Sequence, residues 1–336
     1  MRQLTFLEAG KVEWRDVPAP ELEGDGQAIV RPLSVATCDL DSMVLHGQAP
    51  YKGPFGMGHE GVAEVVDVGD DVDGLEPGQK VTVSYQIYCG QCDACREGRT
   101  GSCEATPPMA MYGLTLGGDW GGFLSDAVRV PYANAMLFPL PDGVDSAAAA
   151  SASDNIADAW RTIGPQLERR PGAEVLVAGG AGAGSIGVYA AGMAVALGAD
   201  RVVYADPDAA RRALAASYGA ETVETYPQRL GPFPITVDAS ASHDGLALAL
   251  RSTAPDDICT STGVYFEQQT PVPLLEMYTK GFTFQTGRPH AGAAIPPVLD
   301  LIAGGWDPAL VTNRVATWEE AAEALLSERG KLVITR

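Results

Sequence analysis

Hydrophobic and polar residues follow two different patterns along the chain. Before residue 146, apolar residues form short β-branched runs such as 28–33 and 62–68, and glycine and proline residues separate these runs. From residue 174 onward, apolar strands alternate with helical stretches, beginning with a strand at 174–178 and a helix at 185–197. The first pattern predicts a β-rich domain, and the second predicts a parallel sheet with helices on both faces.

Further segments extend these two patterns. An alanine-rich stretch at 146–163 predicts a helix that leads into the second domain. The C-terminal residues return to the first domain. The other elements expected are strands at 201–205, 234–238, 257–260, 282–286 and 331–335, and helices at 208–218, 295–303 and 318–327.

Composition narrows the classes of function. Apolar residues make up 46% of the 336 residues and charged residues 20%, which is typical of a folded protein of two domains. The formal net charge of −20 disfavours nucleic acid and anionic membrane partners. The uncharged stretch 175–199 contains seven glycines, so it predicts strand, loop and buried helix in place of a membrane span. Because the first residues show no secretory signal, we expect a cytoplasmic protein.

A glycine-rich turn follows the strand at 174–178. The residues Gly182, Gly184, Ser185, Ile186 and Gly187 fall in a G-x-G-x-x-G pattern that opens the next helix. Such glycines let a pyrophosphate approach the backbone at the positive end of a helix. Close packing of helix on strand is their alternative role.

Asp206 lies at the end of the next predicted strand, 19 residues after Gly187. An acid in this place accepts hydrogen bonds from the adenosine ribose hydroxyls and repels a 2′-phosphate, which favours NAD over NADP. Arg211, one helical turn further, is expected to lie along the ribose. The turn and the acid together predict a dinucleotide-binding domain.

Four of the six cysteines lie close together, at Cys89, Cys92, Cys95 and Cys103. Four thiolates on one short lobe suit a closed tetrahedral zinc site, which stabilises a segment that lacks a core of its own. Disulfides are disfavoured because no export signal accompanies the cysteines. An iron–sulfur cluster is the alternative, since its cysteine runs also use gaps of two residues.

Two more residues, Cys38 and His59, indicate a function only when they are considered together with these motifs. Taken alone, Cys38 is typical of a buried core cysteine and His59 of a turn histidine. With them, however, the whole chain resembles the zinc-dependent alcohol dehydrogenase family of the medium-chain dehydrogenases/reductases. The features that carry the resemblance occur in the family's order: Cys38, Gly58-His59-Glu60, the cysteine lobe, Gly121-Gly122-Phe123 with the segment 128–131, the glycine turn and Asp206.

The resemblance implies an α/β protein in which a β-rich GroES-like catalytic domain accompanies a doubly wound Rossmann domain. The catalytic domain is expected at 1–155 and 288–336, with the zinc lobe at 89–103, and the NAD-binding domain at 156–287. The resemblance further implies two zinc ions per chain, one structural and one catalytic. A homo-oligomer, either dimer or tetramer, is expected.

The resemblance assigns the catalytic zinc to Cys38, His59 and Asp154. A thiolate, a neutral imidazole and a carboxylate leave a fourth position open for water or a substrate oxygen. Glu60 is expected beside His59 as a carboxylate that tunes the coordination, with a solvated turn acid as its alternative role.

Several positions depart from the family's pattern. Leu40 and Met43 occupy places where many relatives carry residues of a proton relay, and Asp158 is the predicted replacement, with Asp41 and Ser42 as alternatives. Asp39 stands where some relatives carry a base for the pyrophosphate.

Two later residues are expected at the cofactor. Arg288 is a candidate substitute for the missing base, or else an ordinary surface arginine. Val264 is the other residue expected to contact the cofactor.

The sequence therefore favours a zinc-dependent oxidoreductase that transfers hydride between NAD(H) and a small alcohol, polyol, cyclitol or the matching carbonyl. A zinc-dependent NAD(P)H reductase of C=N or C=C bonds is the second hypothesis, because hydride delivery to an iminium needs no accompanying proton. A non-catalytic NAD-binding protein on the same fold is the third.

Overall fold

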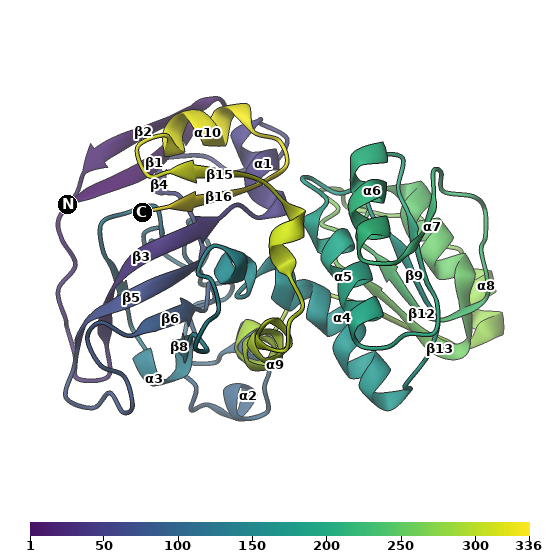
Figure 1. The fold of residues 1–336 in the computed structure, drawn as a ribbon, viewed down its shortest axis with the longest axis horizontal. Helices are drawn as coiled ribbons and strands as arrows, with labels where there is room; N and C mark the ends of the chain where they lie inside the picture. Colours follow the sequence, from purple (N-terminus) through teal and green to yellow (C-terminus); the bar gives the residue numbers. More distant parts are fainter. The chain divides into compact units, whose positions relative to one another are not determined.

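The computed structural model describes residues 1–336 and divides the chain into two compact units (Figure 1). The first unit contains Met1–Ala157 and Pro289–Arg336, and the second contains Asp158–Arg288. These boundaries lie within two residues of the expected ones.

The first unit is built on two sheets. A seven-stranded sheet has the order β15-β16-β3-β5-β6-β8, with β7 also paired to β3, and a three-stranded sheet has the order β2-β1-β4. The C-terminal strand β16 pairs antiparallel with β3, so the last residues of the chain complete the first unit. The strands are β1 (Arg2–Glu8), β2 (Lys11–Asp16), β3 (Ala28–Ala36), β4 (Phe55–Gly56), β5 (Glu60–Val68), β6 (Lys80–Val83), β7 (Val128–Val130), β8 (Leu137–Pro139), β15 (Thr312–Thr317) and β16 (Lys331–Thr335).

Short helices lie between the strands of this unit. Most of them are only one or two turns long, so they belong to the connections between strands and do not form a separate helical layer. They are α1 (Asp39–Leu45), α2 (Asp93–Arg96), η1 (Thr100–Ser102), α3 (Ala133–Met136), η2 (Ala148–Ser151), α9 (Ala291–Ala303), η3 (Pro308–Val311) and α10 (Ala321–Ser327).

The second unit is a doubly wound α/β domain. Its six parallel strands have the order β11-β10-β9-β12-β13-β14, in which the strand order reverses beside the first strand, as in dinucleotide-binding folds. The strands are β9 (Val175–Ala178), β10 (Val202–Ala205), β11 (Glu221–Val223), β12 (Phe233–Asp238), β13 (Thr253–Ser261) and β14 (Thr283–Thr286). The helices are α4 (Asn155–Arg169), α5 (Ser185–Ala196), α6 (Ala209–Ser217), α7 (His243–Ser252) and α8 (Leu274–Lys280).

Buried apolar side chains hold this sheet to its helices. Leu176, Val203 and Phe233 from three neighbouring strands pack with Leu248 of α7 in one cluster. The strands β9 and β10 are buried along their whole length, which explains why their sequences are continuous apolar runs.

The observed elements differ from the expected ones in several places. The helix expected at 146–163 is interrupted: η2 ends at Ser151 and α4 begins at Asn155, so 152–154 form a turn. The helices α7 and α8 and the strands β11 and β15 were not predicted, and β13 begins four residues before the predicted strand. The hydrophobic pattern did not predict β15 because its side chains are mostly polar and half or fully exposed.

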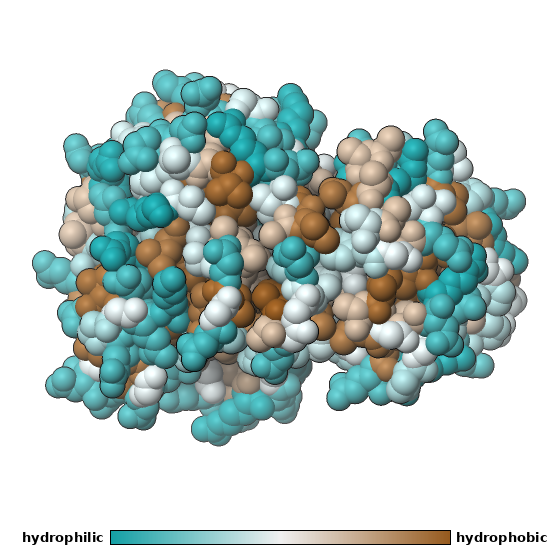
Figure 2. Space-filling view, viewed as in Figure 1, coloured by the Kyte–Doolittle hydropathy of each residue, from teal (hydrophilic) through white to brown (hydrophobic).

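No helix of the protein is both long and apolar enough to cross a membrane. The viewed face in Figure 2 shows teal hydrophilic side chains interspersed with smaller brown hydrophobic areas. The uncharged stretch 175–199 is accordingly a strand, a loop and the buried helix α5, as predicted.

Candidate functional site

Cys38, His59 and Asp154 come together in the first unit. Cys38 immediately precedes α1, His59 immediately precedes β5, and Asp154 lies in the turn before α4. One potential ligand atom from each lies within 4.8 Å of the others, and Nε2 of His59 is 3.2 Å from Oδ2 of Asp154. Three donors of different chemistry therefore converge from distant segments of the chain.

The arrangement of His59 identifies which ring nitrogen is available to a metal. Its Nε2 faces Asp154, whereas its Nδ1 lies 3.7 Å from Oδ1 of Asp41. Oδ2 of Asp41 also accepts a hydrogen bond from the backbone N–H of Cys38, at 2.9 Å. Asp41 thus holds the backbone of Cys38 by a hydrogen bond and places its negative charge beside the imidazole of His59, whose buried Nδ1 has no hydrogen-bond partner.

Negative charge dominates around these side chains. Burial lowers the pKa of His59, but Asp41 and Asp154 outweigh this effect and raise the pKa to about 9. Burial, followed by repulsion from Asp41 and Asp154, raises the pKa of Cys38 well above its ordinary value. A divalent cation among these groups would compensate the carboxylates and favour the thiolate of Cys38, so the donor set fits Zn²⁺.

Glu60 lies behind the metal ligands and is completely buried. It accepts hydrogen bonds from Nζ of Lys331 at 2.5 Å, from the backbone N–H of Asn155 at 3.0 Å and from Oγ of Ser151 at 3.3 Å. Burial raises the pKa of Glu60 to about 7, although Lys331 attracts its ionised form. Because Ser151 and Asn155 flank the turn of Asp154, Glu60 fixes the segment that carries this ligand.

Asp39 reinforces the same turn. Its carboxylate accepts a hydrogen bond from the side-chain amide of Asn155, at 3.3 Å, and Asp39 is itself buried. The acid that departs from the family's pattern therefore connects α1 with the start of α4.

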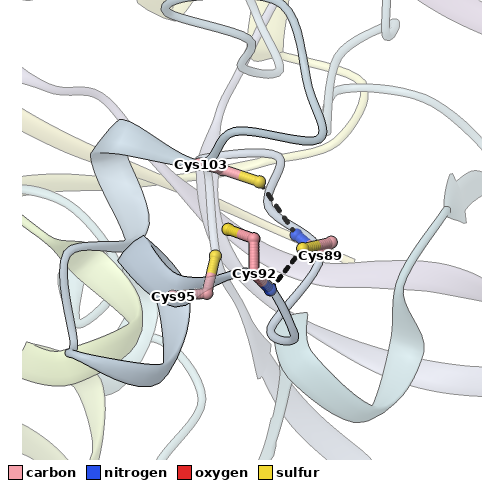
Figure 3. A group of neighbouring side chains, drawn as sticks. All are labelled: Cys89, Cys92, Cys95 and Cys103. Atoms are coloured by element: carbon pink, nitrogen blue, oxygen red, sulfur yellow. Dashed lines mark hydrogen bonds between the residues drawn. The ribbon is translucent and has the colours of Figure 1, made fainter.

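The four cysteines of the lobe form a second candidate metal site (Figure 3). One sulfur from each of Cys89, Cys92, Cys95 and Cys103 lies within 4.8 Å of the others, and none is in a disulfide. Backbone N–H groups donate to these sulfurs, among them the N–H of Cys92 to Sγ of Cys89 at 3.3 Å and that of Cys89 to Sγ of Cys103 at 3.4 Å. Such donors stabilise thiolates, and those of Glu104 and Cys95 lower the pKa of Cys92 to about 6. The donor set fits a closed tetrahedral zinc site.

The glycine turn lies in the second unit, between β9 and α5. Gly182 and Gly184 have φ values of +53° and +74°, which favour glycine because a side chain would be strained there. A Cβ atom on Gly187 would lie 3.1 Å from Cα of Gly179, so this third glycine lets α5 approach β9 closely. Ser185 is buried at the first turn of α5, and Ile186 is half-buried.

Asp206 directly follows β10 and is completely buried. Its carboxylate already accepts hydrogen bonds from Tyr204, Asp208 and Arg211. The position agrees with the sequence analysis, but the sequence predicted an acid open to the ribose, and the structure pairs it with Arg211.

Comparison with known proteins identifies similar dehydrogenases. Residues 24–142 match the model of the alcohol dehydrogenase GroES-like domain. A probable zinc-binding alcohol dehydrogenase of Mycobacterium tuberculosis is 26% identical over 98% of this chain and 86% of its own length. The L-galactonate-5-dehydrogenase of Escherichia coli is 37% identical over 59% of this chain and 53% of its own length. The structure of an alcohol dehydrogenase from Thermus sp. ATN1 superposes with a TM-score of 0.87 and 28% identity, covering 100% of this chain and 99% of that one.

The chain belongs to the zinc-dependent alcohol dehydrogenase family. Membership confirms the predicted fold class, a GroES-like domain with a doubly wound domain, and makes the chain an oxidoreductase. The hypothesis of a non-catalytic nucleotide-binding protein loses its support, since the relatives named above are dehydrogenases.

The predicted replacements for the family's proton relay have partners in the structure. The carboxylate of Asp158, in α4, forms an ion pair with Arg161. Arg161 also donates to the backbone oxygens of Ser261 at 3.1 Å and Gly287 at 2.7 Å. Asp41, the other acid considered, accepts a hydrogen bond from the backbone N–H of Cys38 and lies 3.7 Å from Nδ1 of His59. Asp158 and Asp41 thus each form an ion pair or a hydrogen bond within the protein, in addition to any role in proton transfer.

The remaining predicted cofactor residues lie in the second unit. Val264 follows β13 and half of its surface is exposed, whereas Arg288 is half-buried after β14. Both lie beyond the carboxyl ends of parallel strands, the edge at which ligands bind in such sheets.

Sequence reasoning missed Lys331 and Asn155 as partners of the candidate metal site. Lys331 was read only as the first residue of a closing strand, yet it is completely buried against Glu60, 271 residues away along the chain. No local pattern reveals such a pair. A lysine that begins an otherwise apolar run was the single available signal.

Proposed function

We propose that the protein transfers hydride between NAD(H) and a small alcohol, polyol or cyclitol, or the matching carbonyl compound. The observation that carries this proposal is the convergence of Cys38, His59 and Asp154 within 4.8 Å, a donor set with room for a fourth ligand. Zinc held by these residues supplies Lewis acidity toward a substrate oxygen. The lobe cysteines would hold a second, structural zinc ion, so that two ions bind per chain.

The protein's own residues perform the remaining tasks. Asp41 places a negative charge beside the imidazole of His59, and Glu60 keeps the turn of Asp154 in place. The glycine turn and the start of α5 bind the pyrophosphate of the nucleotide through backbone N–H groups. Hydride transfer then requires the donor and acceptor carbons to lie about 3–3.5 Å apart.

The most discriminating experiment combines metal counting with a substrate panel. Full-length protein is assayed for NADH formation with secondary alcohols, polyols and sugar acids, and its zinc content is measured per chain. We expect turnover with at least one class and about two zinc ions per chain. Asp154→Ala should lose turnover and one zinc ion, whereas Asp142→Ala, which removes an exposed carboxylate from the same region, should lose neither. Wild-type protein with zinc in the lobe alone and no turnover would contradict the proposal.

A reductase of C=N bonds is the second candidate function. Leu40 and Met43 cannot transfer a proton, and Asp158 is held in an ion pair with Arg161. Hydride delivery to an iminium needs no proton from the protein. NADH oxidation with cyclic imines, in the absence of NAD reduction by any alcohol, would favour this candidate over the first.

We also propose a cytoplasmic homo-oligomer. All six cysteines are free thiols, as expected in a reducing compartment. The strand β14 is an end strand of its sheet, and Leu274, Leu275 and Tyr278 of the adjacent α8 are each at least two-thirds exposed. An open strand edge with exposed apolar side chains beside it is typical of a contact with a second copy of the same chain.

A further inference from the structure

Three neighbouring strands of the second unit end in register. Asp238 of β12, Ser261 of β13 and Thr286 of β14 lie side by side at the carboxyl ends of these parallel strands. Ligands of doubly wound sheets bind along this edge, and each half of the sheet takes one half of a dinucleotide. Because Asp206, the acid proposed for the adenosine ribose, follows β10, the half formed by β12, β13 and β14 is the one for the nicotinamide end.

Asp238 joins β12 to the segment that follows β13. Its Oδ2 accepts hydrogen bonds from the hydroxyls of Ser261 at 2.7 Å and Tyr265 at 2.9 Å. Its backbone oxygen accepts a hydrogen bond from the N–H of Thr262, also at 2.8 Å. Val264, a proposed cofactor residue with half of its surface exposed, therefore lies in a segment that is held on both sides.

Arg161 of α4 joins β13 to β14. Its Nη2 donates to the backbone oxygens of Ser261 at 3.1 Å and Gly287 at 2.7 Å, and these two residues stand at the ends of different strands. Its Nε forms an ion pair with Asp158, one helical turn earlier, and both side chains are mostly buried. One planar guanidinium thus holds two strand ends at a fixed separation, while the carboxylate of Asp158 fixes the direction of the guanidinium.

We propose that Arg161 is a positioning residue for the nicotinamide end of the bound dinucleotide. By holding the ends of β13 and β14 together, it fixes the segments that carry Val264 and Arg288, the two proposed cofactor residues of this half. Segments that are already ordered cost less free energy to immobilise on binding than segments that are free to move. The inference rests on the proposed nucleotide binding and adds to it a residue that acts through backbone oxygens.

The test compares NADH with ADP-ribose, which has the same adenosine half but lacks the nicotinamide. Dissociation constants for the full-length, zinc-loaded protein are measured by isothermal titration calorimetry. The wild type should bind NADH more tightly than ADP-ribose. Arg161→Met should weaken NADH binding at least about tenfold, the loss expected for one charge-assisted hydrogen bond, and should change ADP-ribose binding less than about threefold. A general loss of folded protein would weaken both ligands equally.

A second variant separates the positioning role from the charge of Asp158. Arg161→Lys keeps a cation for this carboxylate but does not reproduce the planar fork that reaches both backbone oxygens. It should therefore also weaken NADH binding relative to ADP-ribose. Arg169→Met is the matched control, because Arg169 belongs to the same helix and donates to Pro165 and Gln166 within it. It should leave both dissociation constants within about threefold of the wild type, well below the effect of one charged hydrogen bond.

Three results would overturn the inference. They are equal effects of Arg161→Met on NADH and ADP-ribose (including no effect on either), full wild-type affinity for NADH in Arg161→Lys, and equal affinity of the wild type for the two ligands. Failure of the wild type to bind both ligands would instead contradict the proposed function itself.

Discussion

Nζ of Lys331 lies 2.5 Å from Oε1 of Glu60, and both side chains are completely buried. The same Nζ also donates to the backbone oxygen of Thr37, the residue before the candidate ligand Cys38. One lysine of the last strand therefore links the segments that carry Cys38 and, through Glu60, Asp154. This buried pair explains how the C-terminal residues contribute to a site otherwise built from the first half of the chain.

Removal of the lysine should leave Glu60 as an unpaired buried charge. We expect Lys331→Met to lower the free energy of unfolding of the first unit by about 3–5 kcal/mol. Urea denaturation followed by tryptophan fluorescence reports on this unit, since four of the five tryptophans lie in it. The double variant Lys331→Met with Glu60→Gln should recover part of the loss. If the single variant is as stable as the wild type, the pair has no stabilising role.

The cysteine lobe should hold one zinc ion independently of nucleotide binding. Cys95→Ser should lose about one zinc ion per chain but keep its affinity for the nucleotide, because the glycine turn and Asp206 belong to the other unit. The control is Cys259→Ala, which removes a buried cysteine of β13 and should retain both ions. Metal analysis and nucleotide titration check these outcomes. Iron and acid-labile sulfide in the wild type would reverse the assignment in favour of a cluster.

Asp158 remains the predicted proton acceptor. Its ion pair with Arg161 allows an effect on proton transfer to be separated from an effect on nucleotide binding. Asp158→Asn should change the shape of the pH profile of turnover. It should leave nucleotide affinity nearly unaltered, because Arg161 keeps its bonds to the oxygens of Ser261 and Gly287. Steady-state rates from pH 5 to 10 and a parallel nucleotide titration separate these effects. A profile identical to that of the wild type would exclude Asp158 from proton transfer.

The proposed contact between copies of the chain is tested through α8. Leu275→Glu places a charge on a side chain that is 76% exposed, so it should dissociate the oligomer without unfolding the monomer. The control is Leu310→Glu, which changes a 46% exposed leucine of the first unit. Light scattering after size-exclusion chromatography gives the mass of each variant. An unchanged mass for Leu275→Glu would exclude this surface as the interface.

The parts of the protein that were predictable are those encoded in contiguous segments. The glycine turn and the cysteine lobe each fall within fifteen residues, so their spacing alone indicated their chemistry, and the alternation of strand and helix indicated the doubly wound unit. Side-chain pairing between elements was not predictable. The bidentate contact of Arg211 with Asp206 depends on a rotamer, and the pair of Lys331 with Glu60 depends on how β16 aligns with β3 and β5. The turn that carries Asp154 was hidden by helix-forming alanines on its N-terminal side.

The central claim is that Cys38, His59 and Asp154 together bind one metal ion. Anomalous diffraction from crystals, recorded on both sides of the zinc absorption edge, tests it most directly. The account predicts a zinc peak about 2.3 Å from Sγ of Cys38 and about 2.0–2.2 Å from Nε2 of His59 and a carboxylate oxygen of Asp154, with a second peak among the lobe cysteines. A peak in the lobe with none between these three side chains, in crystals grown with zinc, would contradict the account.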